Sequence, residues 1–331
     1  MFLSIVIPHY NIEQQLLERC IESIRNIDLP EDRHEIIVID DGSRTPPRWI
    51  EEKYHQKHIR LICADHGGPG AARNRGIYEA KGKYIQFVDA DDYLLTGDSI
   101  HKCIDTLQRE KPQILRFKYT VCTDSNATQP NTAVKFGNTI SGAAYMSSNN
   151  LSGSPCIYFF ERELVIKKNI CFPEDNFHED EEFNTILHYH AQTLIESNAT
   201  LYAYCTRKDS TTTNNSPEFK EKRIENLLSV IERLKFFKNS VSPGCNIIQE
   251  KALQRKITML CVDAILNMLY AGFNAERILQ TCRSKLTPLN LYPLPKSGYS
   301  LKYRIFSTLA NNKIGLSILR LTTPKKKPQQ K

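Results

Sequence analysis

Four short apolar runs in the first 92 residues each stop at polar turn residues, and this pattern constrains the fold more than any other feature of the sequence. The runs lie at 3–7, 36–39, 59–63 and 84–88. Between them, residues 16–24 keep the 3.6-residue apolar period of a helix, and residues 69–80 indicate a second helix with Pro69 in its first turn. Strands that alternate with helices predict an α/β fold with a largely parallel sheet.

The alternation becomes looser from Cys156 and ends near residue 216. We expect helices at 98–109, 162–169 and from 178 onward, strands at 113–121, 157–160 and 194–206, and a loop at 123–138. Beyond Pro217 the strand signals fade, whereas helical spacing continues. The sequence therefore predicts two domains, an α/β catalytic domain at 1–216 and a helical, basic domain at 217–331.

Composition indicates a folded cytoplasmic protein. Hydrophobic residues make up 40% and charged residues 24% of the chain, which is typical of a globular protein. The ten cysteines are scattered without a C-x-x-C pair, so we expect reduced thiols and not a secreted disulfide framework. The apolar N-terminus has no basic flank or cleavage site of a signal peptide, and the apolar stretch 260–273 is too short to cross a bilayer.

Positive charge is concentrated at the C-terminal end. Residues 277–331 contain twelve Lys or Arg and no Asp or Glu, and removing these twelve charges from the net charge of +7 leaves −5 for the rest. Such asymmetry indicates that the last segment meets an anionic surface, either membrane or nucleic acid.

Two clusters of carboxylates follow predicted strands. Asp40 and Asp41 end the second run, and residues 89–92 (Asp-Ala-Asp-Asp) end the fourth. Each cluster alone is also ordinary turn chemistry. Because open α/β sheets bind ligands at the carboxyl ends of their strands, the two together favour a site. A D-x-D can hold a hard divalent cation that also binds a diphosphate; we choose Asp91 as the metal ligand and expect Asp89 to face a ribose.

Three further segments carry candidate groups. The Gly-rich segment 67–73 can receive an anion or a base edge at a helix N-terminus, but it follows the third strand and lacks the last glycine of a dinucleotide fingerprint. Residues 178–183 place four acids at a helix start; capping explains one or two, and another can accept a proton from a hydroxyl group. Arg207 and Lys208 can hold phosphates or belong to a solvated loop.

These residues resemble the family 2 glycosyltransferases. Four motifs stand in the family's order, at residues 4–11 (SIVIPHYN), 35–43 (EIIVIDDGS), 72–76 (ARNRG) and 87–92 (FVDADD). The resemblance continues through 160–164 (FEREL), 172–173 (FP) and 179–183 (EDEEF), and so covers about the first 210 residues.

The resemblance implies a GT-A fold, in which a Rossmann-like nucleotide-binding half joins an acceptor half, here with a C-terminal helical extension. It implies inverting transfer of a sugar from a nucleotide diphosphate sugar, with UDP favoured, to a hydroxyl of a glycan or lipid-linked glycan. Mn²⁺ or Mg²⁺ bound by the last Asp of the D-x-D, Asp91, would assist the leaving group. Asp180 matches the catalytic base, although His178 departs from the usual motif. Nucleotide contacts are implied or expected at Pro8, Tyr10, Asp41, Arg73, Asp89 and Arg207.

Membrane-bound acceptors fit the basic C-terminal segment, where apolar residues recur at helical spacing among Lys and Arg before Lys325–Lys327. We therefore expect a peripheral protein on the inner face of the membrane and no nucleic-acid partner. Two alternatives stay open: a nucleotide-diphosphate-binding protein without transfer activity, and a sugar nucleotidyltransferase. One sequence does not identify the sugar, the acceptor, the linkage or the oligomeric state.

Overall fold

The protein divides into two compact units in the computed structural model, Met1–Ser210 and Thr211–Lys331. The structure describes residues 1–322 apart from 56–57, 123–130, 132, 152, 175–176, 207–215 and 297–298. Arg207, the Lys325–Lys327 tail and much of the predicted loop 123–138 lie outside the described residues.

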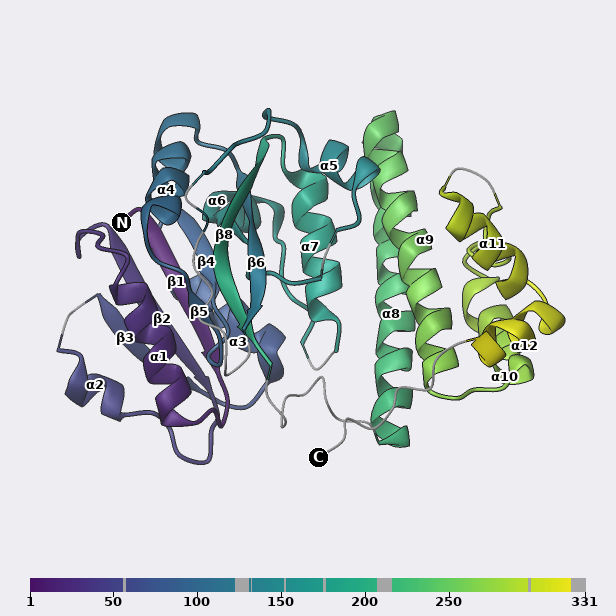
Figure 1. Cartoon of the computed structure of the whole chain (residues 1–331), viewed down its shortest axis with the longest axis horizontal. Coiled ribbons are helices and arrows are strands. Elements are labelled where there is room, and N and C mark those ends of the chain that lie inside the picture. Colours follow the sequence, from purple (N-terminus) through teal and green to yellow (C-terminus); the bar gives the residue numbers. More distant parts are fainter. Residues whose placement is uncertain are drawn as a thin grey trace. The chain divides into compact units, whose positions relative to one another are not determined.

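The first unit is built on an eight-stranded sheet with the order β3-β2-β1-β4-β7-β6-β8-β5 (Figure 1). Four parallel strands form one half: β1 (Leu3–His9), β2 (His34–Asp41), β3 (Ile59–Ala64) and β4 (Tyr84–Phe87). The other half contains β5 (Tyr93–Leu94), β6 (Ile114–Cys122), β7 (Tyr158–Glu161) and β8 (Leu194–Cys205).

The second half of the sheet is mixed, so the expectation of a largely parallel sheet is wrong there. Strand β7 runs antiparallel to both β4 and β6, and β5 runs antiparallel to β8, whereas β6 and β8 are parallel. Strand β5 pairs with β8, and β4 pairs with β7, so these neighbours are distant in the chain and are not joined by a single crossover helix. Periodicity identifies strands but does not give their direction.

Helices cover the sheet of the first unit, and their apolar stripes explain why they form. Helix α1 buries Leu17, Cys20, Ile21 and Ile24 on one face, and each aliphatic side chain contributes about 1.5–3 kcal/mol when removed from water. The strand residues of β2 are buried throughout, as expected for a strand covered on both faces. The helices are α1 (Gln14–Arg25), α2 (Trp49–Lys53), α3 (Gly68–Glu79), α4 (Asp98–Glu110), α5 (Gly142–Ser148), α6 (Arg162–Lys168) and α7 (Glu179–His190).

The second unit is helical over its described residues. Helices α8 (Pro217–Val241) and α9 (Ile247–Tyr270) pack along each other, joined by a 3₁₀ turn at Ser242–Gly244 (Figure 1). Then follow α10 (Ala275–Thr281), a π-helical turn (Cys282–Leu286), α11 (Leu301–Ala310) and α12 (Lys313–Thr322). Ser216 caps α8 by accepting a hydrogen bond from the Phe219 N–H, and Asn246 forms a capping box with Gln249. None of the helices described here has the length and apolarity to span a bilayer.

Candidate active site

The carboxyl ends of β1, β2 and β4 lie at one edge of the sheet, because the three strands are parallel neighbours. In the register of β1 and β2, His9 stands opposite Asp40. Strand β4 ends at Phe87, immediately before the turn that contains Asp89, Asp91 and Asp92. The fold thus brings both predicted carboxylate clusters to the same edge.

The end of β2 forms the first part of the site around Asp41. Its buried carboxylate accepts hydrogen bonds from the backbone N–H groups of Gly67 (2.9 Å) and Gly68 (3.0 Å), and its Oδ2 lies 2.8 Å from Nδ1 of His66. The N–H groups of the Gly-rich segment, expected to receive a ligand, therefore already bind an internal carboxylate. Gly42 permits this approach: its φ is +72°, and a Cβ there would lie 2.8 Å from the backbone nitrogen of His66.

An aromatic platform lies beside Asp41. The Tyr10 ring is 45% exposed and stacks on the His66 ring, with 4.3 Å between centroids and 18° between planes. Pro8 precedes it on β1 and is half-buried. The structure thus brings Pro8, Tyr10 and Asp41 together, as the sequence predicted for nucleobase contacts, and adds His66, whose position after β3 gave no signal.

A buried polar cluster supports this platform. His9 Nδ1 lies 2.9 Å from Asp40 Oδ1 and 3.3 Å from Ser43 Oγ, and that hydroxyl accepts the Asn11 N–H at 2.8 Å. His9 and Asp40 are almost fully buried. The cluster fixes the loop after β1 to the loop after β2, which positions Tyr10.

Arg73 of α3 connects the D-x-D turn to α7. Its guanidinium donates to Asp89 Oδ1 at 3.0 Å and to Glu179 Oε1 at 2.7 Å. The guanidinium also lies against the faces of Phe87 and Phe172. Burial alone would lower the pKa of Arg73, but Asp89 and Glu179 raise it above its ordinary value, so the group stays charged.

The three carboxylates of the D-x-D turn have different environments. Asp92 is buried; its Oδ2 accepts the Tyr202 hydroxyl at 2.5 Å and its Oδ1 accepts the Cys205 N–H at 2.7 Å. Burial, and then the charge of Asp89, raise the pKa of Asp92 to about 8. Asp91 is half-buried, and its backbone carbonyl accepts from Arg19 at 2.6 Å. Asp92 therefore anchors the turn, whereas Asp89 and Asp91 keep exposed surface.

The D-x-D turn fits a divalent cation that shares its coordination with a ligand. Among the residues that the structure describes, no three His, Cys, Asp or Glu side chains gather into an all-protein metal site. Mg²⁺ and ions like it are commonly held by one or two carboxylates together with substrate phosphates and water. The pair Asp89 and Asp91 supplies such a donor set, and no structural zinc-type site competes with it within the described ranges.

Asp180 opens α7 next to Glu179, the residue that Arg73 binds. Its Oδ1 accepts the Glu181 N–H at 2.9 Å. A Cβ placed on Gly153 would lie 3.0 Å from Asp180 Oδ2, so the loop before β7 closes over the carboxylate. Burial, followed by the charges of Glu179 and Glu181, raises the pKa of Asp180 to about 8, while Arg73 lowers it. The carboxyl is therefore mostly protonated at neutral pH.

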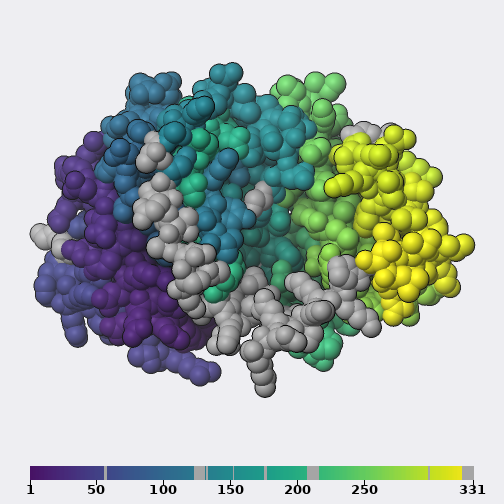
Figure 2. Space-filling view, viewed as in Figure 1, coloured from purple at the N-terminus to yellow at the C-terminus, as the bar shows by residue number. Residues whose placement is uncertain are grey.

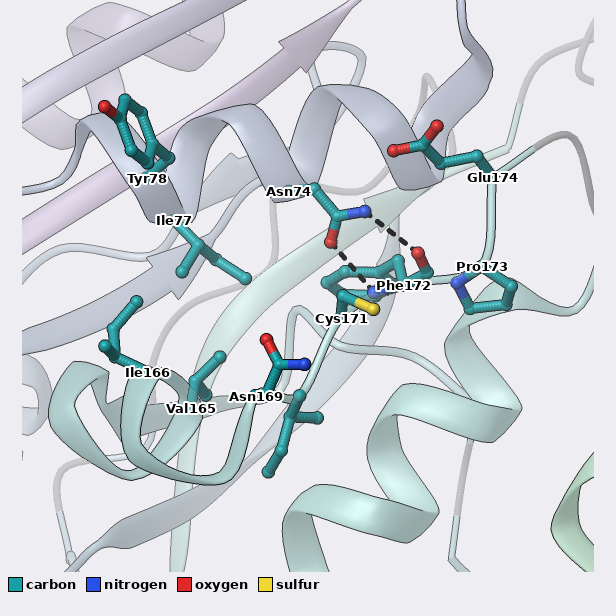
Figure 3. A pocket seen from close by; sticks show the side chains of 11 residues that line it. Asn74, Ile77, Tyr78, Val165, Ile166, Asn169, Cys171, Phe172, Pro173 and Glu174 are labelled. Atoms are coloured by element: carbon teal, nitrogen blue, oxygen red, sulfur yellow. Dashed lines mark hydrogen bonds between the residues drawn. The ribbon is translucent and has the colours of Figure 1, made fainter. Parts of the chain in front are cut away.

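Asn74, next to Arg73, ties α3 to the segment after α6 (Figure 3). Its side-chain amide donates to the Phe172 carbonyl at 2.9 Å and accepts the Phe172 N–H at 2.8 Å. Phe172 stacks on Phe183 of α7 with 3.8 Å between centroids. A shallow hollow of about 600 Å³ opens beside these bonds, bordered by Tyr78 and Ile166. Asn74 thus has a structural function that explains its place in the 72–76 motif.

Comparison with known proteins identifies related chains. Residues 4–167 match the model of glycosyl transferase family 2. A poly(ribitol-phosphate) beta-glucosyltransferase of Bacillus spizizenii is 43% identical over 98 residues, which are 28% of this chain and 15% of the relative. The glycosyltransferase EpsJ of Bacillus subtilis is 29% identical over 218 residues, with 63% and 62% of the two chains covered. The chain spans less than two thirds of the length of either relative.

Solved structures share the fold. The crystal structure of S. aureus TarS 1–349 has a TM-score of 0.65 at 18% identity and covers 98% of this chain and 90% of that one. The mannosyltransferase PcManGT of Pyrobaculum calidifontis, solved in complex with GDP-Man and Mn²⁺, has a TM-score of 0.56 at 15% identity, with 97% and 87% covered. The expected GT-A fold with C-terminal helices is therefore confirmed.

Proposed function

We propose that the chain transfers a sugar from a nucleotide diphosphate sugar to a hydroxyl group with inversion, because residues 4–167 match the model of glycosyl transferase family 2. The observation that carries this proposal is the linkage made by Arg73. One guanidinium binds Asp89 of the predicted diphosphate site and Glu179, the neighbour of the predicted base Asp180. A donor site and a proton acceptor thus belong to one connected cluster.

The nucleotide binds at the platform formed by Pro8, Tyr10 and Asp41. The exposed Tyr10 ring offers a stacking face for a base, and Asp41 Oδ1, which accepts the Gly67 N–H, keeps a second lone pair for a base N–H. Asp89, the first Asp of the D-x-D, would face the ribose. UDP is the favoured nucleotide, because TarS, which shares the fold, was solved with UDP-GlcNAc and with UDP.

Asp91, with Asp89 beside it, would hold Mn²⁺ or Mg²⁺ together with the donor diphosphate. A bound metal ion offsets the negative charge that develops on the leaving nucleoside diphosphate. Arg207, outside the described residues, is a candidate for further phosphate contact.

Asp180 acts as the general base. In an inverting displacement the acceptor hydroxyl loses its proton as its oxygen attacks the anomeric carbon from the side opposite the diphosphate. A carboxylate on α7, separate from the D-x-D turn, suits this position. The raised pKa of Asp180, about 8, makes the ionised form a stronger base than an exposed aspartate, at the cost of a smaller ionised fraction at neutral pH.

The acceptor is a hydroxyl of a glycan or a glycan-like polymer attached to lipid. Two relatives are named for transfer to poly(ribitol-phosphate), a polymer of hydroxylated units. Binding of residues 277–331 to an anionic membrane surface would bring the protein to such an acceptor.

The last two helices supply the membrane contact. Large apolar side chains stand exposed on α11 and α12, with Leu301, Ile314 and Leu321 exposed by 69%, 77% and 87%. Lys302, Arg304, Lys313 and Arg320 lie among them, on the helices coloured yellow at the C-terminal end in Figure 2. Apolar side chains among cations are typical of helices that lie in the interface of an anionic bilayer.

Donor turnover tests the function directly. The full chain is incubated with Mn²⁺ and a panel of UDP-sugars, and release of UDP is followed with and without soluble hydroxyl acceptors. Asp91→Asn should abolish both turnover and the Mn²⁺ dependence of UDP binding, whereas Asp105→Asn, at an exposed position of α4, should change neither. UDP binding without turnover under any donor would favour the non-catalytic alternative, and turnover by Asp91→Asn equal to wild type would remove Asp91 from the site.

A further inference from the structure

Strands β6 and β8 end side by side, and each ends in a cysteine. In their parallel register Cys122 pairs with Cys205. Paired residues of neighbouring strands point to the same face, about 4.8 Å apart between strands, which lies within the Cα separation of about 4.4–6.8 Å that a disulfide spans. The two thiols also hydrogen-bond each other. The fold therefore joins two cysteines that no sequence spacing links.

Both thiols are in contact with the D-x-D turn or its supports. Cys205 Sγ accepts from Arg19 at 3.3 Å, and the same Arg19 nitrogen donates to the Asp91 carbonyl at 2.6 Å. The Cys205 N–H binds Asp92, while Cys122 Sγ lies 3.3 Å from the Tyr93 hydroxyl. A change at this pair can therefore act on Asp91 through Arg19 and on Asp92 through the Cys205 N–H.

Accessibility combined with strand pairing distinguishes this pair from the other cysteines; Cys245 is also partly exposed, but it stands in the turn between α8 and α9. Cys122 and Cys205 are both partly exposed. The charge of Cys282 acts on Cys261, but both thiols are buried, which shields them from a dissolved disulfide. Cys63 and Cys171 are exposed, and the structure gives neither of them a neighbouring thiol.

We propose that Cys122 and Cys205 form a dithiol that a low-molecular-weight disulfide oxidises to a cross-strand disulfide, and that this modification weakens donor binding at the adjacent D-x-D turn. The Cys122 thiolate attacks one sulfur of oxidised glutathione and releases the first glutathione thiolate. The Cys205 thiolate then attacks the Cys122 sulfur of the mixed disulfide and releases the second. The protein loses two electrons and two protons, and the products are two molecules of reduced glutathione.

The positions of the two thiols assign their order. Arg19 holds Cys205 Sγ at 3.3 Å, next to its strand partner Cys122, and burial raises the pKa of the Cys205 thiol to about 12. It suits the second, intramolecular step, in which proximity compensates for a small thiolate fraction.

The disulfide would alter the turn through two contacts. Arg19 loses the Cys205 thiol as an acceptor, and movement of the β8 end disturbs the bond from the Cys205 N–H to Asp92. Loss of about one hydrogen bond would weaken Mn²⁺-dependent UDP binding by roughly three- to tenfold. This second half of the proposal rests on the proposed function, whereas formation of the disulfide does not.

Peptide mapping tests the modification. The full chain is treated with oxidised glutathione, remaining thiols are alkylated, and the unreduced protein is digested and analysed by mass spectrometry. We expect a cross-linked peptide pair containing Cys122 and Cys205 in the wild type and in the matched variant Cys63→Ser. In Cys205→Ser we expect glutathione attached to Cys122 instead. Glutathione on both cysteines without a cross-link, or no reaction at either, would overturn the proposal.

Calorimetric titration with UDP and Mn²⁺ tests the coupling. Oxidised wild-type protein should bind UDP three- to tenfold more weakly and recover after dithiothreitol. Cys205→Ser keeps a hydroxyl acceptor for Arg19 and cannot form the cross-link, so its UDP affinity should stay the same after oxidation although Cys122 carries glutathione. Equal affinity of cross-linked and reduced wild type would refute the coupling. If reduced protein fails to bind UDP with Mn²⁺, the proposed function fails, and the cross-linking result still decides the thiol chemistry.

Discussion

The buried ion pair between Arg73 and Glu179 predicts a specific order of stability among three variants. Both side chains are about one-tenth exposed, and Arg73 NH1 lies 2.7 Å from Glu179 Oε1. Removing one partner of a buried pair costs about 3–5 kcal/mol, because the other charge stays buried. Since Arg73 keeps its bond to Asp89, we expect the lower limit, about 3 kcal/mol, for Glu179→Ala.

Glu179→Gln should be milder, because the amide oxygen still accepts the Arg73 N–H and only the charge is lost. A charged hydrogen bond exceeds a neutral one by about 1 kcal/mol. For a unit of this size each kcal/mol lowers the Tm by about 2–4 °C, so we expect decreases of about 6–12 °C for Glu179→Ala and about 2–4 °C for Glu179→Gln.

Differential scanning calorimetry of the full chain measures these shifts in the transition of the first unit. The matched control is Glu163→Ala, which removes an exposed ion pair with Lys167 on α6 and should leave the Tm unchanged. If Glu179→Ala melts within 2 °C of this control, the reasoning about a buried pair is refuted. A second readout is independent of stability: loss of the Glu179 charge should lower the pKa of Asp180 and move the pH dependence of transfer to lower pH.

Three further predictions concern the base, the pH dependence and the membrane. Asp180→Asn should reduce transfer by about 10²–10⁴-fold while leaving UDP affinity with Mn²⁺ close to wild type; normal transfer by this variant together with loss in Glu181→Gln would move the role to the neighbour. Because the pKa of Asp180 is raised to about 8, the ionised base accumulates as pH rises, so kcat should increase about tenfold per pH unit between pH 6 and 7 and level off above pH 8 to 9; a flat profile would exclude Asp180 as the titrating base. The full chain should sediment with anionic liposomes, less so at high salt, whereas a chain ending at residue 295 or the double variant Ile314→Ser/Leu321→Ser should not. The control is Ile247→Ser, at an equally exposed apolar position on α9. Equal liposome binding by all of these proteins would show that the basic segment is an ordinary solvated surface.

The strands that carry the site could be predicted from sequence because their signals are local. The runs that became β1, β2, β3 and β4 are mainly apolar and stop at turn residues, and the parallel register then brings Asp41 and Asp89 to one edge without further information. The family motifs added the roles of Asp91 and Asp180, which remain predictions.

The rest depends on contacts between segments distant in the chain. Nothing in the spacing of Arg73 and Glu179 indicates that they pair, and Arg73 was expected beside a nucleobase. Three other features likewise form only when distant segments pack together: the direction of β7, the pairing of Cys122 with Cys205, and the hydrogen bonds from the Gly-rich N–H groups to Asp41. Such contacts are set by tertiary packing, which periodicity and turn chemistry do not describe.

The bonds from Gly67 and Gly68 to Asp41 bear on how this fold meets a diphosphate. In many nucleotide-binding proteins a helix begins with unoccupied N–H groups, and a phosphate neutralises its positive end. Here the N-terminus of α3 is already neutralised by a carboxylate of the protein, so an approaching phosphate would meet negative charge instead. In the function proposed above, electrostatic compensation for the donor would come from a divalent cation at Asp91 and from cationic side chains. A donor site of this kind should lose most of its affinity for the diphosphate, but little of its affinity for the nucleoside, when the metal is removed.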